Sequence, residues 1–547
     1  MKPVPFRHWV VARADDDYTA IRFEDESWTY REAVQAGAER AAFVLAERRE
    51  GRPLHVGVLL ENVPEFWFWL AAAALSGGVV VGINPTRRGA ELARDIRHTD
   101  CQWIVTDAEH RELLEGLEIE APILQVDGED YRAKLASFAG APIPDVEVGM
   151  SDCLLLIFTS GTSGTPKAVI CTQRKLSFAS QNVARTAGLG RESVTYVAMP
   201  MFHSNCLFMG WGPTVVAGGT AVLRRRFSAS SALPDIRKYG CTYFNYVGKP
   251  LSYILAQPER PDDAENPLEF VFGNEAADLD IERFSKRFDV PVMDSYGSTE
   301  TGAIVSRVEG MPKGALGRGG PEIKVLDPET GPECPPAIFD AKGRLRNAEE
   351  AIGELVNTGG VALFEGYYKN DEANAKRTRN GWYWTGDLAY RDAEGFLYFA
   401  GRDFEWLRVD GENFAAAPVE RILARYPGVV LAAVYAVPDA EVGDQVMAAL
   451  EMQDPESFDP AAFDAFLSAQ EDLGTKWAPR YVRVSRSLPV TQTSKVQKRQ
   501  LRSERWECDE LVWFRPERAD RLRRLEPEDR EALRAAFAAR GRESLLI

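Results

Sequence analysis

The sequence lacks features that are diagnostic of several classes of protein. It has seven cysteines in 547 residues, but no Cys-x-x-Cys pair and no metal-ligand spacing among them. Scattered thiols favour a reducing compartment and argue against a disulfide scaffold or a zinc module. Basic residues also do not outnumber acidic residues. The net charge of −17 argues against nucleic acid or an anionic membrane as a partner.

Signals for export or membrane insertion are also missing. The N-terminus has neither a long apolar core nor a small-residue cleavage site, so we expect no signal peptide. One uncharged stretch, Phe66–Ile83, is long enough to imitate a membrane span. Ser76–Gly78 divides this region into a helix-like part, Pro64–Leu75, and a β-branched part, Val79–Ile83. This division favours a buried helix and a buried strand, so we expect a soluble, cytoplasmic protein.

The amino-acid composition is that of an ordinary globular protein. The chain is too long to form a single hydrophobic core. Its 45% hydrophobic and 27% charged residues are typical of a soluble protein, and its length predicts two or more domains. Roughly the first 150 residues alternate helical and strand-like runs, which predicts α/β layers with a largely parallel sheet. These runs are a helix over 30–48, a strand over 54–60, the helix and strand just described, and a strand over 103–106.

A loop rich in glycine and hydroxyl side chains separates two apolar runs. Phe158–Val169 reads FTSGTSGTPKAV; Cys153–Phe158 before it indicates a short buried strand. Glycines bring backbone N–H groups close to a ligand, hydroxyls donate to phosphate oxygens, and Lys167 adds a point charge. A flexible linker is the alternative, but it requires neither the strand nor the lysine. The Walker-A pattern does not match, because no glycine precedes Lys167 and no Ser or Thr follows it.

TSGTSGTPK resembles the signature loop of the adenylate-forming superfamily, which includes acyl-CoA synthetases, adenylation domains of peptide synthetases, and luciferases. The resemblance covers most of the chain, from about Ile21 to about Arg502, and the superfamily's motifs come in its order. The resemblance implies an α/β protein with a large N-terminal domain of layered mixed sheets and helices, residues 1–402. A small, mobile α+β C-terminal domain would cover 403–547. We expect its charged segment, from about residue 516, to be a solvated helical tail without a catalytic role.

The resemblance implies that the loop binds ATP and that its lysine and hydroxyls hold the leaving β- and γ-phosphates. The residues concerned are Thr159, Ser160, Gly161, Thr162, Ser163, Gly164, Thr165 and Lys167. A small-residue turn follows the apolar run 270–272, at a strand end, where α/β sheets collect ligands. The superfamily places this turn against the adenine and the acyl chain. Its residues here are Gly273, Asn274, Glu275 and Ala276.

The stretch from Tyr296 to Glu300 resembles the superfamily's YGxTE motif. The resemblance implies that the Tyr296 ring stacks on adenine, that Thr299 bonds the α-phosphate, and that Glu300 helps hold Mg²⁺ through oxygen ligands. A core tyrosine and a surface glutamate are the alternative interpretation. The other nucleotide-binding residues of this stretch are Ser295, Gly297 and Ser298.

Two motifs follow near the predicted domain boundary. Trp384–Leu388 matches the TGD motif, whose carboxylate, here Asp387, holds the ribose hydroxyls, although an aspartate in a turn is usually a turn former. Arg402 would contact ribose or phosphate. Gly411 begins a Gly-Glu-Asn triplet that resembles the loop entering the active site for the thioester step. Phe404 occupies the hinge position, where relatives usually carry Asp or Lys, so the usual polar anchor of the hinge is missing.

The last motif, from Leu488 to Lys498, resembles the superfamily's PxTxxGK motif. Lys495 aligns with the lysine that reaches the attacking carboxylate and the α-phosphate, and Lys498 is the second candidate. Ser494 replaces the usual glycine. The segment TQTSKVQK resembles the corresponding segment of very-long-chain and sterol-side-chain acyl-CoA synthetases. The triplet at Gly411 and the alanine after Lys167 also resemble those enzymes.

A proline-x-aromatic-His stretch, ending at Phe202 and His203, borders the carboxylate pocket in the superfamily and moves between reaction steps. We therefore expect His203 to act in catalysis and Phe202 to line the pocket, although a lone histidine beside aromatics is more often a core or capping residue. Met209, Trp211 and Asn245 are further candidates for contact with the acid. Bulky apolar residues of this kind would fit an ordinary core equally well.

Three functions compete. The first is an acid–CoA ligase that activates a very-long-chain, steroid-derived or polycyclic terpenoid acid with ATP, Mg²⁺ and CoA, with a homodimer common among relatives. The second, motivated by Phe404, is an acyl-adenylating enzyme that passes its product to a carrier protein or a separate ligase. The third is a catalytically silent ligand-binding protein. Retention of the nucleotide motifs argues against it; the retained residues are Lys167, Glu300, Asp387, Arg402 and Lys495.

An amino-acid-activating enzyme is disfavoured. Such relatives usually carry an aspartate for the substrate amine directly after the pocket aromatic, where this chain has His203. A histidine cannot take that anionic role. Asp294 remains an alternative partner for an amine.

Overall fold

The computed structural model describes residues 2–159, 167–341, 345–402, 406–409, 412–440, 444–474, 476–491, 496–517 and 520–546. The chain forms two compact units, and both combine helices with sheets, as the resemblance implies. Unit 1 consists of Met1–Ala276, Ile281–Gly302 and Val361–Arg379. Unit 2 consists of Ala277–Asp280, Ala303–Gly360 and Asn380–Ile547.

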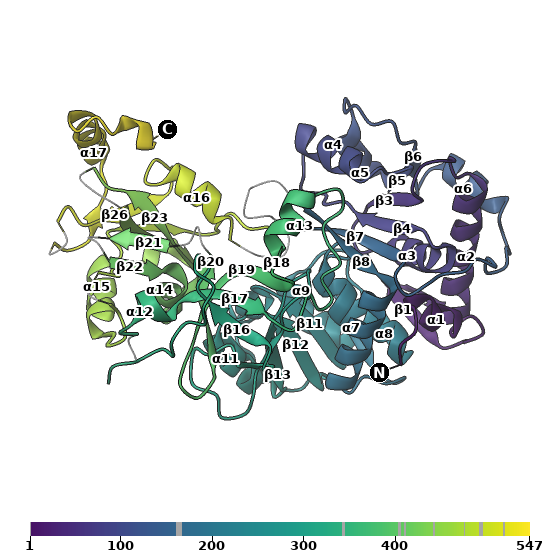
Figure 1. Ribbon diagram of the computed structural model, residues 1–547, viewed down its shortest axis with the longest axis horizontal. Helices are drawn as coiled ribbons and strands as arrows, with labels where there is room; N and C mark the ends of the chain where they lie inside the picture. Colours follow the sequence, from purple (N-terminus) through teal and green to yellow (C-terminus); the bar gives the residue numbers. More distant parts are fainter. Residues whose placement is uncertain are drawn as a thin grey trace. The chain divides into compact units, whose positions relative to one another are not determined.

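The first sheet of unit 1 has six strands in the order β6-β5-β3-β4-β7-β8 (Figure 1). Neighbouring strands pair in parallel, except that β7 and β8 are antiparallel, which confirms the predicted largely parallel sheet. The strands are β3 (His55–Leu59), β4 (Val79–Gly82), β5 (Trp103–Thr106), β6 (Ile123–Gln125), β7 (Cys153–Thr159) and β8 (Lys167–Thr172).

A second sheet carries seven strands of unit 1 in the order β13-β12-β11-β9-β10-β1-β2. They pair in parallel up to the final hairpin, in which β1 and β2 are antiparallel. The strands are β1 (Thr19–Phe23), β2 (Glu26–Thr29), β9 (Val194–Val197), β10 (Thr220–Leu223), β11 (Tyr243–Val247), β12 (Phe270–Asn274) and β13 (Val292–Tyr296).

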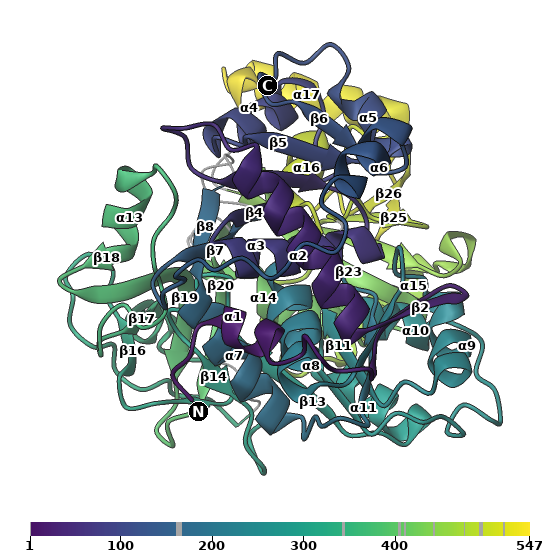
Figure 2. The ribbon, with the colours of Figure 1, turned by 90° about the vertical axis from the view of Figure 1, so that its right-hand side faces the viewer.

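The apolar stretch that imitates a membrane span is a buried helix and a buried strand, as predicted. α3 (Pro64–Ser76) ends at Gly77, whose φ of 72° is a conformation that glycine adopts without strain, and β4 follows. α2 (Tyr30–Ala46) lies beside α3 (Figure 2), and a Cβ on Gly37 would be only 2.7 Å from that of Ala71. Within the described residues, each helix is too short or too polar to cross a membrane.

The remaining helical segments of unit 1 are mostly short and connect or cover its strands. They are α1 (Phe6–Val11), α4 (Gly89–His98), α5 (Ala108–Arg111), η1 (Glu112–Leu114), α6 (Glu129–Ala136), α7 (Gln173–Thr186), the π-helix η2 (Cys206–Trp211), α8 (Gly212–Ala217), α9 (Ala229–Tyr239), α10 (Pro250–Leu255), α11 (Asp278–Phe288) and α13 (Asp371–Arg377), followed by β18 (Thr378–Arg379).

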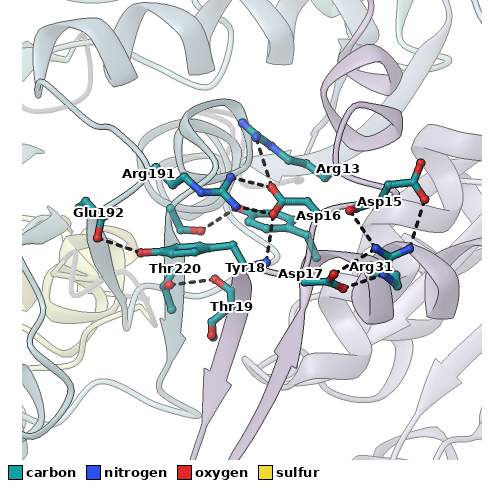
Figure 3. A network of polar contacts seen from close by, with 12 residues as sticks. Arg13, Asp15, Asp16, Asp17, Tyr18, Thr19, Arg31, Arg191, Glu192 and Thr220 are labelled. Atoms are coloured by element: carbon teal, nitrogen blue, oxygen red, sulfur yellow. Dashed lines mark hydrogen bonds and ion pairs between the residues drawn. The ribbon is translucent and has the colours of Figure 1, made fainter.

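The N-terminal segment of unit 1 is held by an ion-pair network (Figure 3). The Asp16 carboxylate accepts hydrogen bonds from both terminal nitrogens of Arg191, at 2.8 and 2.6 Å, and pairs with Arg13 at 3.5 Å. The Arg191 hydrogen bonds, with smaller help from the Tyr18 amide, outweigh burial and lower the pKa of Asp16 to about 2. This network attaches the segment before β1 to the loop before β9.

Among the described residues, unit 2 contains one antiparallel sheet, one mixed sheet and two antiparallel strand pairs. The strands of the first sheet are β16 (Ile323–Leu326), β17 (Gly353–Asn357), β19 (Trp382–Arg391) and β20 (Leu397–Arg402). The pairs are β14 (Val305–Ser306) with β15 (Arg318–Gly319), and β21 (Trp406–Val409) with β22 (Glu412–Ala415). The short helix α12 (Ala348–Ala351) precedes β17.

The other sheet of unit 2 runs β23-β24-β25-β26-β27, with one parallel pair, β24 and β25. The strands β23 and β24 are consecutive in the chain and are followed by the helix α15. The elements are α14 (Ala416–Leu423), β23 (Val429–Pro438), β24 (Asp444–Met452), η4 (Pro455–Ser457), α15 (Pro460–Ala469), β25 (Tyr481–Ser485), α16 (Lys498–Glu504), β26 (Leu511–Phe514), β27 (Arg523–Arg524), α17 (Pro527–Ala539) and η5 (Glu543–Leu546).

The charged C-terminal segment is helical over α17, but it is less solvated than we expected. Leu522, Leu525 and Phe537 are buried, and the Phe537 ring lies 6.3 Å from that of Trp506. Charged residues dominate the composition of the segment, so its few buried apolar residues could not be recognised from composition. Packing onto the sheet of unit 2 therefore orders part of this tail.

Candidate functional site

The carboxyl ends of β11, β12 and β13 meet at one edge of the second sheet of unit 1. Gly273 is paired with Tyr246 on one side and with Asp294 on the other. A Cβ at position 273 would be 2.4 Å from the Tyr246 carbonyl oxygen, so this site requires glycine. The Asp294 carboxylate accepts hydrogen bonds from the Tyr246 hydroxyl at 2.7 Å and the Ala276 amide at 3.1 Å. These contacts tie Asp294 to the turn and give no support to an amine-binding role.

Asparagine side chains hold the turn after β12. Asn274 donates to the Ser295 carbonyl at 2.5 Å and to its hydroxyl at 3.1 Å. Asn205, which the sequence analysis does not single out, donates to the Tyr246 carbonyl at 2.8 Å and accepts from Asn245 at 2.8 Å. An amide can donate and accept at once, which lets Asn205 join separate strands. The structure thus brings the predicted residues Asn274, Ser295 and Asn245 together through an unpredicted one.

Glu300 is a buried carboxylate with defined partners. Its Oε1 accepts a hydrogen bond from the Tyr367 hydroxyl at 2.8 Å, and its backbone carbonyl accepts one from the buried ammonium of Lys175 at 3.0 Å. Burial acts to raise the pKa of Glu300, but the charge of Arg377 and the Tyr367 hydrogen bond outweigh it and lower that pKa. Glu300 is therefore ionised at neutral pH, as a cation ligand must be.

Lys167 begins β8, directly opposite Thr159, the last residue of β7. Its ammonium lies over the Tyr367 ring, 5.2 Å from the centroid. Burial and the nearby Arg377 lower the pKa of Lys167, while the Glu300 carboxylate acts in the opposite direction. Two ends of the predicted phosphate loop are thus placed on neighbouring strands. Its other predicted residues, Ser160–Thr165, lie outside the described residues.

The predicted Thr299 and His203 come from segments that touch each other. The hydroxyl of Ser204 is 2.7 Å from that of Thr299, which links the histidine stretch to the stretch that carries Glu300. His203 is partly exposed, and its ring lies 4.5 Å from that of Phe202. Gly82 packs against Phe202, since a Cβ there would be 2.8 Å from the Phe202 carbonyl oxygen. Of the other residues predicted to contact nucleotide, Tyr296 is partly buried, whereas Gly297 and Ser298 are exposed.

The predicted acyl-pocket residues lie on η2, β11 and the stretch before η2. Phe202, Met209, Trp211 and Asn245 are all buried. Trp211 packs against the Phe6 ring at 5.0 Å and the Trp67 ring at 6.1 Å. Six residues of π-helix are unusual, and π-helical turns are frequent at functional sites. The tight packing around Trp211 is typical of a residue in the apolar core.

The predicted ribose motif lies in unit 2. Asp387 on β19 is paired with Arg402 on β20, so the two backbones are neighbours. Gly386 has a φ of 71° and donates its amide to a Glu354 carboxylate oxygen at 2.6 Å. The Asp387 amide donates to the Thr385 hydroxyl at 3.0 Å, which fixes the turn around this buried carboxylate.

Three predictions concern residues outside the described part: Lys495, Gly411 and the hinge residue Phe404. The alternative catalytic lysine, Lys498, is described. Its ammonium pairs with Glu420 at 2.9 Å. This ion pair holds the Lys498 side chain at the start of α16.

The donor set around Glu300 fits Mg²⁺. Among the described residues, no group of three or more His, Cys, Asp or Glu side chains is gathered to form a metal cage. Mg²⁺ is usually bound through one or two carboxylates together with substrate phosphates and water, rather than by such a cage. A single ionised carboxylate near Lys167 meets that requirement.

Comparison with protein families identifies both parts of the chain. The model of the AMP-binding enzymes matches residues 6–368, and the model of the AMP-binding enzyme C-terminal domain matches residues 418–495. Together they cover most of the chain and agree with the order of the motifs.

Individual relatives match nearly the whole chain. A steroid-22-oyl-CoA synthetase from Rhodococcus jostii RHA1 is 51% identical over 92% of this chain and 91% of its own length. A medium/long-chain-fatty-acid–CoA ligase, FadD17, from Mycobacterium marinum is 48% identical over 90% of this chain and 95% of its own. The fold also matches the crystal structure of ATP-bound MatB from Rhodopseudomonas palustris, with a TM-score of 0.77, 23% identity, and coverage of 91% and 98%. The chain therefore belongs to the family of AMP-binding enzymes and is an AMP-forming acid–CoA ligase that uses ATP, Mg²⁺ and CoA.

Proposed function

We propose that this enzyme activates the side-chain carboxylate of a steroid-derived acid, first to an acyl-AMP and then to an acyl-CoA. The observation that carries the proposal is the 51% identity to a steroid-22-oyl-CoA synthetase over 92% of the chain. The similar identity to a medium/long-chain-fatty-acid–CoA ligase makes an extended fatty acid the second candidate. Both candidates are apolar acids. We place the reaction in the cytoplasm.

The described residues support the first half-reaction. Lys167 would hold the leaving phosphates, and Glu300 would hold the Mg²⁺ that neutralises their charge. Asp387 would bind the ribose hydroxyls. Attack on the α-phosphorus brings two anions together, so the Lys167 ammonium and the cation held by Glu300 would offset the repulsion. Lys495 would bridge the carboxylate and the α-phosphate before CoA replaces AMP.

The acid would lie against Phe202 and Met209, which retain small exposed areas of 4% and 7%. Trp211 and Asn245 are completely buried and would support this wall from behind. The Asn245 Oδ1 atom lies behind this wall and is buried without a hydrogen-bond partner.

The experiment follows pyrophosphate release with ATP and Mg²⁺, with and without CoA. The acids are a C22 steroid acid, medium- and long-chain fatty acids, and several amino acids. The proposal expects the steroid acid to have the highest kcat/KM and acyl-CoA to accumulate. A preference for fatty acids would overturn the substrate assignment. Acyl-AMP that accumulates despite CoA would instead favour transfer to a carrier protein or a separate ligase.

A Lys167→Ala variant is the control for the site. Calorimetry in the absence of acid should show weaker ATP binding by this variant than by the wild type. Equal ATP affinities would contradict the phosphate-binding role of Lys167, whatever acid the enzyme prefers.

A further inference from the structure

Tyr367 contacts two charged groups that the proposed mechanism uses for different purposes. Its hydroxyl donates to Glu300 Oε1 at 2.8 Å, and its ring faces the Lys167 ammonium at 5.2 Å from the centroid. Arg377 adds a third contact, from its Nε to the Tyr367 hydroxyl oxygen at 3.3 Å. Tyr367 is 2% exposed, so these contacts form in a water-poor environment, where electrostatic interactions are stronger than in water.

The backbone of Tyr367 is fixed as firmly as its side chain. It forms an antiparallel bridge with Val169, two residues after Lys167. The Asn374 side chain accepts a hydrogen bond from the Tyr367 amide at 2.6 Å and donates one to its carbonyl at 3.1 Å. A tyrosine held at both backbone groups can define the position of whatever its hydroxyl and ring contact.

Lys167 and Glu300 come from distant parts of the sequence and carry opposite charges. Left to themselves, a long lysine and a glutamate this close would attract each other and neutralise the charges that phosphate and metal require. Contact with the ring stabilises the ammonium without a carboxylate. The hydroxyl occupies one oxygen of the carboxylate, which orients the group and directs its second oxygen elsewhere.

We propose that Tyr367 is a positioning residue that holds the Glu300 carboxylate for Mg²⁺ and the Lys167 ammonium for the phosphates of the same nucleotide. The inference rests on the proposed roles of Glu300 and Lys167. Hydrogen-bond partners of metal ligands typically change metal affinity by about 10–100-fold when they are removed. The hydroxyl and the ring of Tyr367 therefore have separable effects, one on Mg²⁺ and one on phosphate.

The chain offers a matched control in the next residue. The Tyr368 hydroxyl also donates to a carboxylate, Asp100 Oδ2, at 2.6 Å, and the Tyr368 ring also lies beside a lysine, Lys369, at 5.5 Å. Tyr368→Phe thus removes the same kind of hydrogen bond away from Glu300. Any general cost of losing a tyrosine hydroxyl should be similar in the two variants.

The test measures ATP binding by calorimetry in the absence of acid, with and without Mg²⁺, so that no turnover occurs. For Tyr367→Phe we expect the enhancement of ATP affinity by Mg²⁺ to fall by about tenfold, with little change in Mg²⁺-free affinity. Tyr368→Phe should keep the wild-type enhancement. Tyr367→Leu, which also lacks the ring, should in addition weaken ATP binding without Mg²⁺.

A double-mutant cycle with Glu300→Gln supplies the second arm. If Tyr367 acts through Glu300, adding Tyr367→Phe to Glu300→Gln should cause no further loss of the Mg²⁺ effect. This pair also guards against misfolding, because Glu300→Gln removes the buried charge that Tyr367→Phe would leave with fewer partners. Additive losses, or a Mg²⁺ enhancement in Tyr367→Phe equal to that of Tyr368→Phe, would overturn the inference.

The wild-type control distinguishes a failure of the proposed role of Glu300 from a failure of the proposed role of Tyr367. If wild-type ATP binding does not depend on Mg²⁺, the proposed role of Glu300 fails, and the inference fails with it. If the wild type and Tyr367→Phe show the same Mg²⁺ dependence, the inference fails alone and the role of Glu300 stands.

Discussion

The buried ammonium of Lys175, on α7, donates a hydrogen bond to the backbone carbonyl of Glu300 at 3.0 Å. Lys175 is completely buried, and this burial lowers its pKa. A protein retains such a costly group only where its contacts outweigh the desolvation. Here the contact fixes the backbone from which the Glu300 carboxylate projects, so the helix after the phosphate loop also sets the position of the predicted metal ligand.

Lys175→Met tests this relationship, because methionine keeps the length and apolar stem but donates no hydrogen bond. We expect kcat/KM for pyrophosphate release to fall by about tenfold as Glu300 loses its fixed position. The melting temperature should change little. The unsatisfied carbonyl costs about 1–3 kcal/mol, but the variant no longer buries an ammonium. Lys238→Met, at a side chain 56% exposed, is the control and should match the wild type in both measurements.

Asp16 makes stability depend on pH in a predictable direction. Its folded pKa of about 2 lies below the unfolded value of 3.8, so its contribution is fully present above 3.8 and is lost as the pH falls through about 2. We expect Asp16→Asn to lower the free energy of unfolding by about 1 kcal/mol at pH 7, after allowance for screening near the surface. Urea unfolding should show a constant difference above pH 5 that shrinks below about pH 4.

Asp15→Asn is the matched control for that series. The Asp15 side chain is 97% exposed and pairs with Arg31 at 3.3 Å, so its loss should leave the free energy of unfolding unchanged within about 0.5 kcal/mol. An equal loss in both variants would show that general charge balance, and not the Arg191 contact, accounts for the effect.

Two glycines of the candidate site should respond differently to a methyl group. Gly273→Ala places a Cβ 2.4 Å from the Tyr246 carbonyl oxygen, so we expect about 1–3 kcal/mol of destabilisation from overpacking. Gly297→Ala meets nothing within 4 Å and should fold like the wild type. If Gly297 borders the nucleotide, its variant should raise the KM for ATP severalfold. Thermal unfolding and ATP titration of both variants would distinguish the two effects, and an unchanged KM would remove Gly297 from the site.

The two candidate lysines of the last motif can be distinguished by substitution. Lys498 already pairs with Glu420, so Lys498→Ala should change kcat for adenylation by less than about threefold. Lys495→Ala should lower it by about 10²-fold or more, because it removes a charge aimed at the transition state. Acyl-AMP formation in single-turnover experiments would check both. The reverse order of effects would assign catalysis to Lys498.

The sequence predicted the order of elements well wherever the hydrophobic pattern was unambiguous. The split at Gly77 was visible because glycine, unlike other residues, ends a helix in the left-handed conformation without strain. The strands β3 and β5 and the helix α2 agree closely with the predicted ranges. The tail was predicted less well, since Phe537 is one buried ring within a charged helix, and composition averages over such anchors.

The motifs placed the candidate site residues, but they did not reveal which side chains support them. Nothing in the sequence distinguishes Tyr367 from Tyr368, which are neighbours of the same type. In the structure one donates to Glu300 and the other to Asp100. Lys175 likewise appears in the sequence as an ordinary charged residue near the start of a helix, although it is completely buried.

The family, the reaction class and the positions of the predicted nucleotide motifs could be predicted from the sequence alone. Glycines, hydroxyls and single charged groups at fixed spacing carry that chemistry locally. The residues that contact Glu300 and Lys167 become known only from the tertiary structure. Those partners come from α7 and from the segment before α13, more than 60 residues from Glu300 in either direction. Such contacts depend on how strands and helices pack, and they follow no local pattern that a sequence could display.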